Sequence, residues 1–538
     1  MRLPARPALA AALALVVVAA LAGYGVYLGT TREVPAPGGT LHEGVIVDGP
    51  FSLLPPFAAT QNARDISSLL YRGLTRPGPD GRPQPDLAAS WQADPKATTF
   101  TFHLRPKLSW SDGTPLTSAD ALFSLTVLQA DELRGTAVGD AWQGVTATAP
   151  DAQTVVYTLP SPSSAFPTLA SIGLLPAKKL SGRPAAQLRD TTDAPTSGPF
   201  RLQRVDRDVI HLVRNSHAGT KPYLDGLDIR LMTSETDALA ALQSGSIDLL
   251  TGASMSDAAG LRGSSRFRVV APWTFSYAQV LFNQKTAALA ELKVRRAVAQ
   301  AIDRKGMIAS LLSGYGRLDG TPVPPTISWA ADPNPGLGFD PRAAARSLDA
   351  AGWARHGTAT RTKSGQALSL RLAAPDLPLY RSLAAGIKAD LGAVGIAVQP
   401  SFVSPDRVLG DVLQAHNFDL ALSLIDNGPD PDIFVFWHSS EEQAGGFNFS
   451  GMPADPFLDK DLEDGRFKTD LAARKTAYLD AQKILRTGQP AVWLFNPSVP
   501  ELVSSRIKGF SLPPAAAPGQ RYEDVAGWYI NSRRVGKG

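Results

Sequence analysis

The sequence predicts a mixed α/β fold in which some strands pair in parallel. A helix over residues 379–393 ends at Gly395, and a strand over residues 396–403 follows it. A helix over residues 404–414 then leads to an apolar strand over residues 418–425. Strands joined through a helix in this way pair in parallel with a right-handed crossover. Solutes bind beyond the carboxyl ends of such strands, which directs attention to the loop after Ile425.

The N-terminal half of the sequence predicts antiparallel strands and capped helices. Phe100, Phe102 and Leu104 alternate with polar residues, as in a strand with one buried face. Thr117 is expected to cap a helix, and strands over residues 200–205 and 209–214 read as a hairpin. The 538 residues are 44% hydrophobic and 19% charged, which suits two or three domains with large cores.

Two further segments read as buried strands. They are YAQVLFN over residues 277–283 and AVWLFN over residues 491–496, and they share an apolar-Phe-Asn ending. By themselves these patterns indicate two ordinary core strands.

The N-terminus predicts export. Arg2 and Arg6 precede an apolar run over residues 8–28, which would span ~31 Å as a helix, about the thickness of a bilayer core. Residues 1–29 are therefore expected to be a membrane anchor, or a signal peptide cleaved after Ala22, with the N-terminus in the cytoplasm. Residues 30–39 read as a linker and residues 531–538 as a disordered tail.

Composition excludes several functions. There are no cysteines, so disulfides, thiolate metal sites, thiol catalysis and a lipid-modified N-terminal cysteine are ruled out. The 53 basic and 49 acidic residues are mixed along the chain, which argues against nucleic acid as a partner. No enzyme motif appears, so a binding protein is favoured over an exported hydrolase, and no cofactor or metal is expected.

Several motifs in a fixed order carry a family resemblance. They include SSLLYRGLTRPGPDGRPQPDLAASW from Ser67, SGPF from Ser197, VRRAVAQAIDR from Val294 and AAGW from Ala350. Together they resemble the family 5 extracellular solute-binding proteins, the dipeptide-, oligopeptide- and nickel-binding components of ABC importers.

The resemblance implies a two-lobed, type II periplasmic-binding-protein fold that closes on its ligand. Lobe one would take residues 40–278, with an extra subdomain at about 62–190, and lobe two residues 279–490. Residues 491–530 would return to lobe one. The segments over residues 277–283 and 491–496 would be paired strands at the hinge between the lobes, with two ordinary core strands as the alternative. The implied protein is a monomeric, extracytoplasmic trap that passes small peptides to ABC permease subunits. A nickel chelate, sugar or opine ligand, or a membrane-anchored sensor role, remain alternatives.

The acidic loop DNGPDPD, which begins at Asp426, is the first candidate for the ligand site. The aspartate resembling Asp426 binds the ligand ammonium in dipeptide-binding relatives, and Asn427 and Asp430 share its loop. The extra residue Pro429 leaves the choice between Asp426 and Asp430 open. A solvated turn is the alternative.

Other candidate ligand residues come from three segments. Arg381 resembles an arginine that takes the ligand carboxylate, although a helix-surface arginine is the competing interpretation. Thr60 and Gln61 lie in a segment that resembles the cleft lining of lobe one. Phe434 and Trp437 would form an aromatic wall after the acidic loop, with core packing as the alternative.

Overall fold

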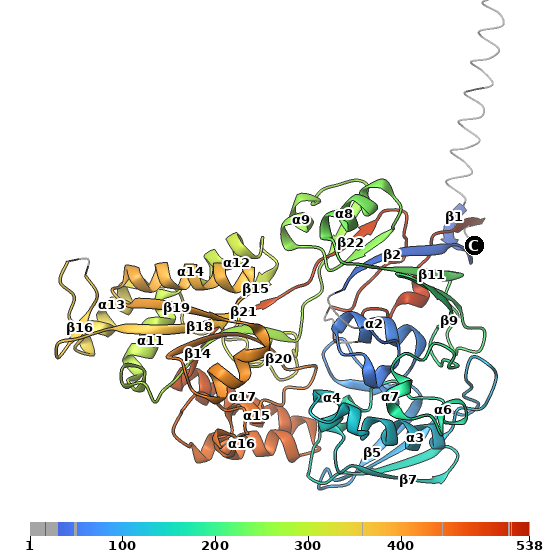
Figure 1. The fold of residues 1–538 in the computed structure, drawn as a ribbon, viewed down its shortest axis with the longest axis horizontal. Coiled ribbons are helices and arrows are strands. Elements are labelled where there is room, and N and C mark those ends of the chain that lie inside the picture. The colour runs from blue at the N-terminus through green and yellow to red at the C-terminus, as the bar shows by residue number, and fades with distance from the viewer. Residues whose placement is uncertain are drawn as a thin grey trace, which may run out of the picture.

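The computed structural model describes residues 17, 31–47, 51–357, 359–443, 445–514, 517 and 519–536. Two lobes lie side by side, each built on its own sheet (Figure 1). Apart from Val17, the N-terminal segment predicted to enter a membrane lies outside the described residues. Among the described residues, no helix is both long enough and apolar enough to cross a bilayer.

Lobe one contains a mixed sheet of seven strands in the described part of the chain. In spatial order they are β13 (Phe267–Val270), β22 (Glu501–Ser504), β12 (Leu249–Thr251), β2 (Thr40–Ile46), β11 (Gly226–Met232), β10 (Val209–Arg214) and β9 (Phe200–Asp206). The predicted hairpin is confirmed as β9 and β10, which pair antiparallel. Strand β2 pairs in parallel with both β11 and β12.

An antiparallel four-stranded sheet forms the core of a subdomain on lobe one (Figure 1). Its order is β5 (Ala88–Ala93), β6 (Thr99–Leu104), β8 (Thr154–Thr158) and β7 (Thr146–Asp151). A small hairpin, β3 (Thr75–Pro77) with β4 (Pro83–Pro85), precedes it. The predicted cap is confirmed, because Thr117 and Asp120 form a capping box at the start of the following helix.

The helices of lobe one and its subdomain are α2 (Gln61–Leu70), α3 (Ser118–Leu128), α4 (Ala137–Ala141), α5 (Phe166–Leu169), α6 (Ala177–Leu180), α7 (Ala185–Leu188), α8 (Glu235–Ser244) and α9 (Met255–Gly260).

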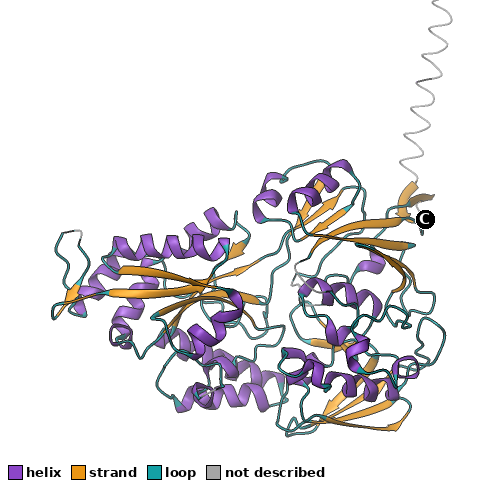
Figure 2. Ribbon diagram, in the orientation of Figure 1, coloured by secondary structure: helices purple, strands orange, loops and turns teal. Residues whose placement is uncertain are grey.

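Lobe two contains a six-stranded sheet with helices on both faces (Figure 2). Its order is β15 (Gly316–Arg317), β21 (Ala491–Pro497), β14 (Ser276–Phe282), β20 (Leu420–Asp426), β18 (Ser369–Pro375) and β19 (Ala397–Val403). The predicted parallel orientation of β19 and β20 is confirmed, but the two strands are not neighbours: β18, which was not predicted, lies between them and pairs in parallel with both. Strand β14 is buried on both faces, which explains its nearly continuous apolar run.

The helices of lobe two are α10 (Ala287–Ala290), α11 (Leu292–Ala301), α12 (Arg304–Leu311), α13 (Pro341–Ala350), α14 (Pro378–Ala393), α15 (Phe434–Trp437), α16 (Pro456–Phe467) and α17 (Leu471–Gly488). A short hairpin, β16 (Thr362–Lys363) with β17 (Gln366–Ala367), projects from this lobe.

The chain passes between the two sheets at residues 271–275 and 498–500. Strands β14 and β21, the two segments interpreted as hinge strands, pair antiparallel inside the lobe-two sheet. The two connections therefore lie a few residues away from the lobe boundaries expected from the sequence. Two short segments of the chain link the lobes.

The segments expected to be a linker and a disordered tail contain paired strands. Strand β1 (Thr31–Pro35) pairs antiparallel with β23 (Ser532–Gly536). Lys508 adds an ion pair to Glu33, with 2.5 Å between Nζ and Oε1. Composition suggested a tether and a free end, but the backbone groups of each segment satisfy those of the other.

Candidate functional site

The loop that follows β20 lies between the lobes. Strands β18, β19 and β20 point the same way, so their carboxyl ends share one edge of the sheet. Beyond that edge, a methyl group placed on Gly81 would lie 2.2 Å from the carbonyl oxygen of Pro429. Gly81 belongs to the turn between β3 and β4 in lobe one, so the acidic loop of lobe two is in direct contact with lobe one.

A pocket of about 410 Å³ opens beside this contact. Its lobe-one side is formed by α2, by α4 with Trp142, and by the segment after α5, and its lobe-two side by Gly428 and Pro429. The lining residues are Pro55, Arg64, Ser67, Ser68, Tyr71, Pro77, Ala137, Val138, Ala141, Trp142, Thr168, Leu169, Ser171, Ile172, Gly173, Gly428, Pro429, Ala517 and Gly519. The lining is mostly apolar with a few polar groups, which is typical of small-molecule sites of this size.

Two carboxylates of the acidic loop already have partners within lobe two. Both carboxyl oxygens of Asp430 accept hydrogen bonds from Nη2 of Arg474, at 2.8 and 3.0 Å. Burial raises the pKa of the Asp430 carboxyl, and the Arg474 guanidinium opposes that rise. Asp432 pairs with Arg466, with 2.8 Å between Oδ2 and Nε. These two aspartates therefore hold the loop in place.

Asp426 is in a different environment. It is exposed at the end of β20, and its Oδ1 accepts a hydrogen bond from the backbone N–H of Gly428, at 3.0 Å. Within the described residues, no cationic side chain pairs with it. Of the loop's three carboxylates, Asp426 is the one whose charge is available to a ligand.

Asn427 fixes the loop from its other side. Its Nδ2 donates to the carbonyl of Pro322 at 2.7 Å, and its backbone N–H donates to Phe275. Its side-chain oxygen is buried without a hydrogen-bond partner in the described structure. The residue therefore orients the loop.

A second contact joins the lobes at the end of α16. The backbone N–H and the hydroxyl of Ser164, in lobe one, donate to the carbonyl of Arg466 at 2.8 and 2.7 Å. Arg474 supports the same helix end by donating to the carbonyl of Gly465. Because Arg466 and Arg474 also pair with Asp432 and Asp430, the acidic loop and this interlobe contact share one network.

Arg381 lies at the same sheet edge but has a partner. Its Nε is 2.6 Å from Oδ1 of Asp376, and its guanidinium stacks on Phe402 at 4.4 Å. The side chain is 53% exposed. Its charge is balanced by Asp376, and it does not line the interlobe pocket.

The other candidates are placed apart from the pocket lining. Thr60 caps α2, and its hydroxyl accepts from the N–H of Ala63. Gln61 is the first residue of α2, one turn before the helix reaches the pocket. Phe434 and Trp437 belong to the lobe-two core, where Phe434 stacks on His438 and Trp437 packs near Trp493. Their packing corresponds to the alternative weighed for them in the sequence.

Sequence reasoning missed the lobe-one side of the pocket. Arg64, Ser67 and Ser68 of α2 and Tyr71 just after it line the pocket, and none of the four was a candidate from the sequence. Their i, i+3, i+4, i+7 spacing places these side chains on one face of a helix, but it does not show that a pocket lies there. Trp142 had no such signal, because only the tertiary fold brings it beside α2.

A buried ionic cluster supports α2 and the segment around Gly519. Arg521 pairs with Glu43 and Glu501, and the Tyr522 hydroxyl donates to Glu43. Beside it, Asp65 of α2 accepts a hydrogen bond from the N–H of Gly519 at 2.7 Å. Burial raises the pKa of Asp65 to about 7. The cluster fixes one wall of the pocket from behind.

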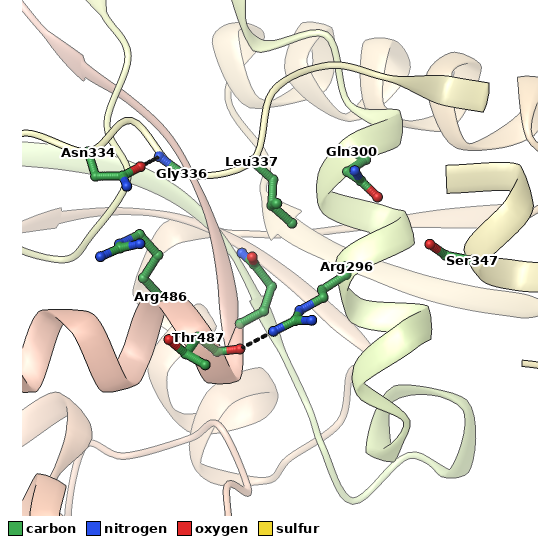
Figure 3. Close-up of a pocket in the computed structure, with 9 residues that line it drawn as sticks. Arg296, Gln300, Asn334, Gly336, Leu337, Ser347, Arg486 and Thr487 are labelled. Atoms are coloured by element: carbon green, nitrogen blue, oxygen red, sulfur yellow. Dashed lines mark hydrogen bonds between the residues drawn. The ribbon is translucent and has the colours of Figure 1, made fainter. Parts of the chain in front are cut away.

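Another pocket, of about 460 Å³, lies on lobe two between α11 and α17 (Figure 3). Its arginines are engaged with the protein itself. Arg296 donates to the carbonyl of Thr487 at 3.1 Å, and Arg486 pairs with Asp332 at 3.1 Å. The Arg296 side chain thus caps the C-terminal end of α17. This pocket contains no residue of lobe one, so closure of the lobes would not enclose a ligand there.

Two lobes joined by two short connections, with a pocket walled by both, define a protein that binds a small solute by closing around it. The chain belongs to the bacterial extracellular solute-binding proteins, family 5, whose middle-region sequence model matches residues 82–446. The family resemblance and the type II two-lobed fold are thereby confirmed. This is a family of substrate-binding transport proteins.

A similar protein from Brucella ovis is provisionally called an ABC transporter peptide-binding protein. It is 29% identical over 464 residues, which cover 83% of this chain and 85% of that protein. The oligopeptide-binding protein AppA of Bacillus subtilis, solved with a nonapeptide, superposes with a TM-score of 0.69 at 22% identity, covering 93% of this chain and all of that one. NikZ of Campylobacter jejuni, solved with Ni(L-His), gives 0.70 at 22% identity, covering 91% and 99%.

Proposed function

We propose that the protein captures short peptides in the interlobe pocket and delivers them to the permease of an ABC importer. The observation that carries this proposal is the pocket at Gly428 and Pro429, with the unpaired carboxylate of Asp426 two residues away. A carboxylate there suits the ammonium group of a peptide, because charge-assisted hydrogen bonds to an ionised amine are strong. The peptide-binding names of relatives such as the Brucella protein support the same ligand class.

The ligand itself is the direct test. Protein purified without added solute is denatured, and the released small molecules are identified by mass spectrometry. Peptides of a few residues are expected. A nickel chelate, a sugar or an opine recovered in stoichiometric amount would overturn the peptide assignment and leave the solute-binding family intact.

We also propose that residues 1–29 hold the protein at the outer face of the cytoplasmic membrane. Support comes from the two arginines before the apolar run and from the extracellular family to which the chain belongs. Fractionation of cells with N-terminal sequencing is the test. A mature chain that begins at Gly23 and is released in soluble form would show cleavage instead of anchoring.

A further inference from the structure

Arg64 carries a positive charge into the interlobe pocket. It lies in the first turns of α2, and its Nη1 donates to the carbonyl of Ala59 at 2.8 Å. Its Nε is buried, and no atom of the described residues forms a hydrogen bond with it. A carbonyl is a neutral partner, and within the described residues no carboxylate forms an ion pair with Arg64. The guanidinium therefore keeps a charge that no ion pair among the described residues balances.

The pocket around that charge is lined mostly by apolar side chains. Val138, Trp142, Leu169 and Ile172 line the same pocket, and Pro429 closes it from lobe two. An ionised group in apolar surroundings is unfavourable unless a counter-ion joins it, and closure of the lobes strengthens this effect by removing water. The pocket is built to accept an anionic group beside apolar ones.

The nearest acid on the same helix does not meet this need. The carboxyl group of Asp65 accepts a hydrogen bond from the Gly519 N–H at 2.7 Å. Asp65 is 2% exposed, and burial raises its pKa to about 7, so its carboxyl is partly neutral at physiological pH. Its compensation of the neighbouring guanidinium is incomplete.

We propose that Arg64 binds a carboxylate of the ligand, and that the solute carries this carboxylate next to a bulky apolar side chain. The proposal rests on the interlobe pocket being the ligand site, and it narrows the peptide class to free-acid peptides with an apolar residue. Arg381, the arginine that the family resemblance suggested for this role, is already paired with Asp376. Arginine is suited to the task because its planar fork can donate two parallel hydrogen bonds to a carboxylate.

The pocket volume also limits the length of the ligand. At about 410 Å³ it lies near the small end of the range of about 300–1,000 Å³ for ligand pockets. A dipeptide or tripeptide fits that volume better than a long peptide. Such a ligand would bring its carboxylate to α2 in lobe one and leave its amine for lobe two.

The test measures affinities by isothermal titration for three probes. They are leucyl-phenylalanine, its C-terminal amide and 3-phenylpropanoate, an apolar carboxylate without an amine. The proteins compared are the unaltered chain, Arg64→Gln, Arg64→Lys and Arg381→Gln, the last being a matched arginine outside the pocket. Circular dichroism and thermal melting establish that each variant is folded.

The unaltered protein should prefer the acid to the amide by about 30-fold or more, a factor equivalent to ~2 kcal/mol. Arg64→Gln should lose that preference while binding the amide as before, Arg64→Lys should restore part of it, and Arg381→Gln should change nothing. An undiminished preference for the acid in Arg64→Gln would overturn the proposal.

The two proposals fail in different ways. If neither peptide binds but 3-phenylpropanoate binds in an Arg64-dependent manner, the peptide function is wrong and the role of Arg64 stands. If peptides bind with equal affinity as acid and amide, the peptide function stands and the role of Arg64 is wrong. If no probe binds the unaltered protein, both are rejected.

Discussion

Replacement of Gly81 by alanine should prevent the contact between the turn at Gly81 in lobe one and the loop at Pro429 in lobe two. Gly81 has a φ of +85°, in the left-handed region that favours glycine. An added methyl group would lie 2.2 Å from the carbonyl oxygen of Pro429 and 3.2 Å from Phe275. Ordinary van der Waals contact begins near 3.4 Å, so the loop of lobe two would have to retreat by roughly 1 Å.

The cost has two parts that can be separated. The left-handed backbone should lower the free energy of unfolding by about 1–2 kcal/mol wherever alanine replaces such a glycine. The steric conflict acts only when the lobes are together, and overpacking of this kind costs about 1–3 kcal/mol. Ligand affinity should therefore fall by roughly 5- to 150-fold, because ligand binding requires the closed arrangement.

Gly182→Ala is the matched control. Gly182 has the same φ of +85°, but an added methyl group would meet no atom within 4 Å. Thermal melting should show similar destabilisation of both variants. Isothermal titration with the co-purified ligand, and the radius of gyration from small-angle scattering with that ligand present, should set Gly81→Ala apart. Equal affinity and equal compaction in the two variants would refute the argument that this contact belongs to the ligand-bound arrangement.

Other predictions concern aspartates with contrasting surroundings. Asp426→Asn should weaken peptide binding by about 5- to 30-fold in titration, a discounted value because the side chain is exposed, and unchanged affinity would remove it from the site. Asp430→Asn, its loop neighbour, should instead lower the free energy of unfolding by about 3–5 kcal/mol, because it leaves the buried Arg474 unpaired; a melt like that of the unaltered protein would contradict this. Burial raises the pKa of Asp319 from 3.8 to about 7, so folding disfavours its deprotonated form. The contribution of Asp319 to the free energy of unfolding should therefore fall progressively as the pH rises from 4 to 7, by up to about 4 kcal/mol. Denaturant titrations at pH 5 and 8 give the free energy of unfolding at each pH. Asp319→Asn should remove this part of the difference between the two pH values, and an equal difference in both proteins would count against the prediction.

The local elements followed from the sequence because their signals are local. Thr117 with Asp120 caps α3, and Gly245 takes a φ of +81° at the end of α8, as capping and glycine rules require. The common direction of β19 and β20 followed from strands joined through a helical segment, whereas the insertion of β18 between them did not. The loop after β20 was likewise found from the sequence, because parallel strands end at one edge.

The pairing of charges was decided only by the tertiary structure. Asp426, Asp430 and Asp432 stand in one short loop and cannot be ranked by sequence. Asp430 pairs with Arg474 of α17, and Asp432 pairs with Arg466 at the end of α16. Only their packing against the loop leaves Asp426 as the available carboxylate.

The same reason applies to the pocket as a whole. Arg381 was a reasonable candidate by resemblance, yet its guanidinium pairs with Asp376 and stacks on Phe402. The sequence does not show that Arg64 lines a pocket, because the pocket also needs Trp142 and Pro429, which come from another helix and from the other lobe. A local pattern determines the conformation of each segment, whereas the contacts that leave a charge free or balanced form between segments distant in the chain.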